Sequence, residues 1–67
     1  MSPRRLGRML REHREAKGMS QVALAKAARV GRTYIVKLES GEKENPSLDV
    51  LKKLAKALGV SVTELLE

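Results

Sequence analysis

Two short apolar-striped segments, separated by a break of only three or four residues, lie in the stretch SQVALAKAARVGRTYIVKLESG at residues 20–41. The apolar residues of the first segment are Val22, Leu24, Ala25 and Ala28, and those of the second are Ile35 and Leu38. Both sets recur at the spacing of one helix face. Because the break is too short to act as a linker, we expect two short helices that pack directly against each other.

The length of 67 residues favours one domain, residues 1–67, because a chain this short supports a single small hydrophobic core. The absence of cysteine excludes disulfides and cysteine-ligated zinc, so burial and helix capping must supply the stability, and a reducing cytoplasm fits the composition. The start, MSPRRLGRML, has no apolar core of signal-peptide length. No apolar run approaches the roughly 18 residues of a membrane span. We therefore expect a cytoplasmic protein that does not engage a membrane.

Three further helices are predicted outside this stretch, over residues 4–17, 48–58 and 61–66. Ser47 is a good N-cap for the second of them, and the third begins with a capping box at 61–64. In the helix at 48–58, the residues expected to face the core are Leu48, Leu51, Leu54, Ala55 and Leu58. No segment shows sustained alternation of apolar and polar residues, so the predicted fold class is all-α with five short helices.

The charge is unevenly distributed along the chain. Residues 1–37 carry ten Lys and Arg against two acidic residues, whereas residues 38–67 carry four Lys against six acidic residues. An excess of positive charge in one half indicates a side that faces a polyanion, although a basic face without a specific partner would give the same count.

Two helices joined by a tight turn form the helix-turn-helix unit, whose first helix braces the second as the second enters the major groove of DNA. We assign this unit to about residues 20–40. The small side chain of Ala25 would let the two helices approach, and Gly31 would be the conformationally permissive residue that opens the second helix.

At this point the chain resembles a known family, the phage-repressor-like helix-turn-helix regulators, also called the xenobiotic-response-element family. The matching residues are LRE at 10–12, Arg14, KGMSQ at 17–21, LA at 24–25, Val30, Ile35, LE at 38–39, Gly41, PSLDVLKKLAKALGV at 46–60 and ELL at 64–66. The resemblance implies a compact five-helix lambda-repressor-like fold. It also implies a transcriptional regulator that binds double-stranded DNA sequence-specifically, as a homodimer on a palindromic operator.

With Ile35 and Leu38 turned inward, the predicted base contacts lie on the outward arc of the second helix of the unit. They are Arg32, Thr33, Val36 and Lys37. Arg32 suits a two-point contact with guanine, Lys37 suits guanine or a phosphate, and Thr33 and Val36 suit thymine methyl groups. An alternative for Val36 is to cover an apolar gap or a partner surface.

The predicted phosphate contacts are Gln21, Tyr34, Ser40, Lys43 and Asn45. Gln21 lies at the start of a helix, where free N–H groups and the helix dipole favour a phosphate. The alternative for Gln21 is a polar surface residue without a function. The alternative for Tyr34 is to pack over the loop that follows the helix. That loop is less basic than is usual in the family, because it contains Glu42 and Glu44.

The resemblance also implies a partly buried ion pair between Arg14 and Glu39, which would tie the first helix to the third. Two departures from the family pattern are Gly31, where Ser or Thr usually caps the third helix, and His13, where an aliphatic residue is usual. We expect His13 to be a half-buried residue at the rim of the core.

The expected dimer interface is the last helix and the loop before it, through Val60, Val62, Leu65 and Leu66. Some of these four residues should face the core, and the sequence does not separate them from those that face a partner. The alternative function is a protein-interaction module of the same fold, such as a bridging factor or an antitoxin-type partner. An enzyme is not expected, because the chain has one histidine, no cysteine, no phosphate loop and no metal-ligand spacing. We therefore assign no catalytic residue, metal, cofactor or small-molecule ligand.

Overall fold

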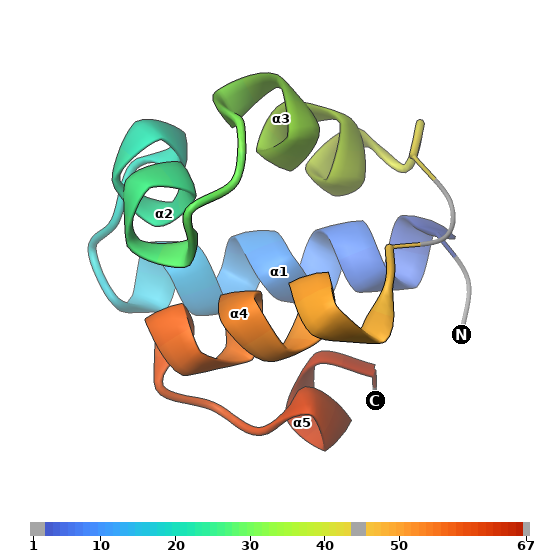
Figure 1. The fold of residues 1–67 in the computed structure, drawn as a ribbon. Helices are drawn as coiled ribbons and strands as arrows, with labels where there is room; N and C mark the ends of the chain where they lie inside the picture. The colour runs from blue at the N-terminus through green and yellow to red at the C-terminus, as the bar shows by residue number, and fades with distance from the viewer. Residues whose placement is uncertain (1–2, 44–45, 67) are drawn as a thin grey trace.

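The computed structural model describes residues 3–43 and 46–66. Its elements in chain order are α1 (Pro3–Ala16), α2 (Gln21–Ala28), α3 (Arg32–Ser40), α4 (Leu48–Leu58) and α5 (Val62–Leu66). Within these described residues there are five helices and no strand, which confirms the all-α prediction (Figure 1).

The helices enclose one hydrophobic core in a nearly equidimensional molecule of 24 × 22 × 21 Å. The helix α1 packs on α3 and α5, while α2 packs on α3 and α4 (Figure 1). The largest fully buried side chains are Leu6, Leu10, Leu24, Ile35, Leu38, Leu54 and Leu65. Because this core draws on all five of the described helices, the orientation of α3 depends on the packing of the whole molecule.

Serine side chains begin three of the helices. The hydroxyl oxygens of Ser20 and Ser47 accept backbone N–H bonds at 3.0 and 3.2 Å. Ser61 and Glu64 form the predicted capping box, in which the Glu64 N–H donates to Ser61 Oγ and the Ser61 N–H donates to Glu64 Oε1. The start of α3 differs, because Gly31 has no side chain with which to cap it. These caps explain why such short helices begin where they do.

The turn between α2 and α3 corrects the expectation for Gly31. Gly31 has an ordinary extended conformation, with φ −72° and ψ 146°, and the left-handed residue is Arg29, with φ 57°. The Arg29 N–H donates to carbonyls of the last turn of α2, and the Val30 N–H donates to the Ala25 carbonyl at 3.0 Å. The left-handed residue thus comes directly after α2, where it terminates the helix and turns the chain toward α3.

Leu48 also departs from its predicted position. Its side chain was expected to face the core, but it is 59% exposed. Leu48 is the first residue of α4. The helical period of 3.6 residues predicts the direction of its side chain, but it does not show whether a neighbouring helix extends far enough to cover that side chain. In the described ranges 3–43 and 46–66, no helix has the length and apolar character needed to cross a membrane.

Candidate nucleic-acid interface

The two faces of α3 are sharply different. Ile35 and Leu38 have no exposed surface and fix one face in the core. The four side chains predicted to contact bases, Arg32, Thr33, Val36 and Lys37, are all exposed. The structure therefore places them together on the side of α3 that faces solvent.

An ion pair between Arg14 of α1 and Glu39 of α3 holds this helix in place. Arg14 Nε lies 2.6 Å from Glu39 Oε2, and Arg14 Nη2 lies 3.0 Å from Glu39 Oε1. Arg14 Nη1 also donates to the Met19 carbonyl at 2.8 Å. The guanidinium of α1 is therefore bonded both to α3 and to the segment that precedes α2. The hydrogen bond to Glu39 raises the pKa of Arg14 above its ordinary value, against the opposing effect of burial.

Gly7 allows the backbones of α1 and α3 to approach each other closely. A Cβ atom at this position would collide with the Leu38 carbonyl oxygen and would lie only 2.7 Å from the Glu39 carbonyl oxygen. Glycine is therefore the residue that fits here, although it weakens a helix interior. Sequence reasoning assigned no role to Gly7, and the signal it missed was a glycine inside a predicted helix, one turn from its start.

Gln21 lies at the start of α2, beside the ion pair. Its Nε2 donates to Glu39 Oε1 at 3.2 Å, which leaves one amide hydrogen available. A groove of about 410 Å³ opens beside it, lined by Arg11, Arg14, Gln21, Val36, Glu39 and Ser40. This groove links α1 and the start of α2 to the outward face of α3.

Tyr34 and Lys43 form a unit where α3 meets the following loop. Lys43 Nζ lies 5.0 Å from the centre of the Tyr34 ring, a cation–π arrangement. Tyr34 is half-buried and packs against the core, so its ring has a structural role. The same contact keeps the Lys43 charge beside α3.

The two remaining predicted phosphate contacts are Ser40 and Asn45. The Ser40 hydroxyl donates to the Lys37 carbonyl at 3.0 Å and accepts from the Glu42 N–H at 3.3 Å. A serine has one hydroxyl proton, and in this conformation that proton is bonded within α3, so a contact from Ser40 to a phosphate would replace the bond to Lys37. The phosphate contact of Ser40 stays a prediction. Asn45 lies outside the described residues.

The predicted dimer residues also divide into two groups. Leu65 has no exposed surface and belongs to the core, which corrects its assignment to an interface. Val60, Val62 and Leu66 are half-buried and pack against the core with part of their surface free. Leu48, which was predicted to face inward, is the most exposed of the large apolar side chains in the described part of the chain.

His13 is half-buried, as expected from its place at the edge of the core. Its Nε2 atom is buried and has no hydrogen-bond partner among residues 3–43 and 46–66. Over the same residues, no group of three His, Cys, Asp or Glu side chains is arranged to hold a metal ion. A lone imidazole nitrogen of this kind does not make a metal site.

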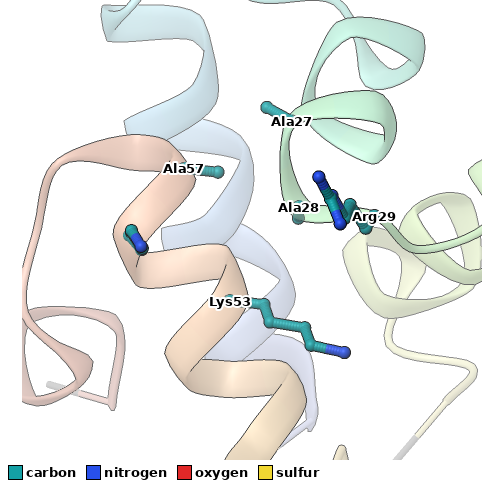
Figure 2. A pocket seen from close by; sticks show the side chains of 6 residues that line it. Ala27, Ala28, Arg29, Lys53 and Ala57 are labelled. Atoms are coloured by element: carbon teal, nitrogen blue, oxygen red, sulfur yellow. The ribbon is translucent and has the colours of Figure 1, made fainter.

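A second hollow, of about 310 Å³, lies between the end of α2 and α4. Figure 2 shows alanines on both helices, with Arg29 reaching in from the end of α2 and Lys53 from α4. Lys56 is its third cation, and Lys53 pairs with Asp49 at 3.2 Å. The carbonyl end of α2 carries partial negative charge, which favours nearby cations and accounts for them without a ligand.

Comparison with known protein families matches residues 10–65 to the family described as Helix-turn-helix. The chain belongs to the helix-turn-helix family. The match includes α2, α3 and α4 in full, and so covers the whole outward face described above.

Relatives of this helix-turn-helix protein include the HTH-type transcriptional regulator SlrR of Bacillus subtilis, which is 40% identical over 62 residues and 92% of this chain. The chain spans 41% of SlrR and 56% of SinR from the same organism, about half the length of these curated relatives.

Two solved structures share the fold closely. The restriction-modification controller protein C.AhdI from Aeromonas hydrophila superposes with a TM-score of 0.90 at 41% identity, covering 94% of each chain. SinR, described as a master regulator for biofilm formation and solved in complex with DNA, gives a TM-score of 0.90 at 35% identity, covering 92% of this chain and 98% of that one. The fold is therefore that of helix-turn-helix regulators.

Proposed function

We propose that this protein is a transcriptional regulator that binds double-stranded DNA sequence-specifically, as a homodimer on a palindromic operator in the cytoplasm. The observation that carries the proposal is the outward face of α3. Arg32, Thr33 and Lys37 are exposed there on a helix whose other face is fully buried. The relatives named as transcriptional regulators, and the DNA complex of SinR, support the same function.

In this proposal Arg32 reads guanine, because it opens α3 and its side chain has no hydrogen bond or ion pair with any other described residue. Lys37 lies further along the same face and reaches guanine or a phosphate. Thr33 and Val36 supply the methyl groups that pack on thymine. The Arg14–Glu39 ion pair acts at a distance from the bases, by fixing the helix that carries these side chains.

Phosphate contacts would position α3 in the groove without reading sequence. Gln21 offers its remaining amide hydrogen at the positive end of α2. Lys43 offers an ammonium group held over the Tyr34 ring, and the Tyr34 hydroxyl is a further donor.

A dimer is part of the proposal because one recognition helix covers few base pairs, whereas two helices about 34 Å apart on the duplex read both half-sites of a palindrome. Val60, Val62 and Leu66 supply partly free apolar surface around α5. Leu48 adds an exposed leucine on α4, the helix that packs against α5.

Selection of bound sequences from a random duplex pool tests the proposal. We expect a palindromic consensus, and binding to it should weaken steeply as salt is raised, because phosphate contacts release counterions. Weak binding to all sequences would instead support the alternative, a protein-interaction module of the same fold. The family comparisons favour the regulator over both that module and an enzyme.

A further inference from the structure

The groove beside α3 contains a cation that the proposed interface leaves without a role. Two arginines of α1 line it, Arg11 and Arg14. Arg14 is occupied by Glu39 and by the Met19 carbonyl, and its side chain is only 10% exposed. Arg11 has a side chain that is 64% exposed, so it is the cation in this groove that can reach a ligand.

Arg11 is held only weakly by its ion-pair partner. Its partner is Glu15, one turn along α1, with Arg11 Nε 3.4 Å from Glu15 Oε2. Exposed ion pairs of this kind add little to stability, because both side chains are solvated and mobile. The acidic residue lining the groove, Glu39, is already paired with Arg14 in two-point geometry. Among the charged residues that line the groove, the one available to bind a ligand is therefore a cation, Arg11.

Hydrogen-bond donors in the same groove suit an anion that has several acceptor oxygens. Gln21 retains one amide hydrogen after its bond to Glu39, and it lies in the first turn of α2, where the helix dipole is positive. Val36 lines the groove and also belongs to the outward face of α3. An anion in the groove would therefore lie directly beside the residues proposed to read bases.

We propose that this groove receives a phosphate of the DNA backbone, and that Arg11 of α1 is a phosphate-binding residue that works together with Gln21. The inference rests on the proposed function and extends it, because it makes the first helix part of the DNA interface. Arg11 sets affinity and orientation and does not select bases, since phosphates carry no direct sequence information.

Replacing Arg11 with Gln tests the proposal, with Arg8→Gln as the matched control. Both arginines are exposed on α1 and both changes remove one charge, but Arg8 does not line the groove. Binding of a selected duplex would be followed by fluorescence anisotropy across a salt series. We expect Arg11→Gln to reduce the slope of log K against log salt by about 0.9 for each phosphate that the variant no longer neutralises, or about 1.8 for a dimer. The selected base sequence should stay the same, and Arg11→Lys should retain most of the slope.

Circular dichroism of both variants verifies that α1 remains folded. If wild-type protein binds with a steep salt slope and Arg11→Gln and Arg8→Gln then behave alike, Arg11 has no phosphate contact and this inference is wrong while the proposed function stands. A wild-type protein that selects no sequence and shows no salt dependence overturns both. A changed consensus in Arg11→Gln would mean that Arg11 reads bases, which also contradicts its role as a phosphate-binding residue.

Discussion

Arg14 and Glu39 are joined by two parallel hydrogen bonds of 2.6 and 3.0 Å, although 25 residues separate them in the chain. Their side chains are only 10% and 6% exposed. The pair lies between the core and the groove, and it ties α1 to the C-terminal half of α3. An arginine held in this geometry restricts rotation of α3 in a way that apolar contacts alone do not.

Glu39→Ala should therefore lower the free energy of unfolding by about 3–5 kcal/mol, because Arg14 would be left charged and poorly solvated. Urea titration followed by circular dichroism measures the loss. Glu15→Ala, which removes the exposed pair with Arg11, is the control and should change stability by less than about 1 kcal/mol. Equal effects of the two changes would show that the Arg14–Glu39 pair adds no more than a surface pair.

The sign of the pH dependence follows from the raised pKa of Arg14. A cation whose pKa is higher in the folded state stabilises the fold below its unfolded-state pKa, and this contribution is lost only as the pH rises through the folded-state value. For arginine that window is strongly alkaline. Ionisation of Arg14 therefore makes a constant contribution to the stability of the fold through neutral pH.

Gly7→Ala should destabilise the protein even though alanine is the better helix former. Alanine gains about 1 kcal/mol in helix propensity over glycine. Its Cβ would meet the carbonyl oxygens of Leu38 and Glu39, which belong to the backbone and cannot move aside cheaply. We expect a net loss of about 2 kcal/mol, measured by thermal or urea unfolding. Arg8→Ala, at the next and exposed position, should change stability by less than about 0.5 kcal/mol, and a stabilised Gly7→Ala would refute the close approach.

Local patterns were sufficient to predict much of this fold. The spacing of Ile35 and Leu38 identified the buried face of α3, and both are fully buried. The serines before α2, α4 and α5 predicted helix starts, because an N-cap depends on side chains within one turn. The outward direction of Arg32 and Lys37 followed from the same periodicity.

What the sequence did not show depends on contacts between distant segments. The need for Gly7 arises from the carbonyls of α3, about thirty residues away. The burial of Leu65 and the exposure of Leu48 depend on which helix covers each one. Arg11 could have been noticed from its position one turn before Arg14, but its place in the groove requires α2 and α3 to be in position.

Arg29→Gly should stabilise the protein by about 1 kcal/mol. Arg29 has a left-handed backbone conformation. This conformation costs a residue with a Cβ atom about 1–2 kcal/mol, and it does not cost glycine that energy. Thermal unfolding measures the gain. Arg29→Ala is the matched control, because it removes the guanidinium group but keeps the Cβ atom, and it should bring no comparable gain. If Arg29→Gly is destabilising instead, the Arg29 side chain must stabilise the fold by more than the strain costs.

Leu48→Ser should weaken dimerisation and leave the protomer folded, because Leu48 is exposed in the protomer. Burying a leucine contributes about 1.5–3 kcal/mol, so the dimer dissociation constant should rise at least about tenfold. Sedimentation equilibrium without DNA measures the change. Val22→Ser, at another exposed apolar residue, is the control, and equal dissociation constants for the two variants would remove Leu48 from the interface.

Arg32→Ala should relax base selection at one position of each half-site. Arg32 begins α3 and is exposed, so removing its side chain leaves the core and the Arg14–Glu39 pair intact. A two-point contact to guanine contributes about 1–3 kcal/mol of discrimination, so preference at that base pair should fall by roughly 5-fold to 150-fold. Repeating the selection from a random duplex pool measures the preference at every position. Lys56→Ala, on α4 beside the second hollow, makes the same change in charge and should leave the consensus unchanged. An Arg32→Ala protein that selects the wild-type consensus with full discrimination would exclude Arg32 from base reading and leave Lys37 as the remaining cation on that face.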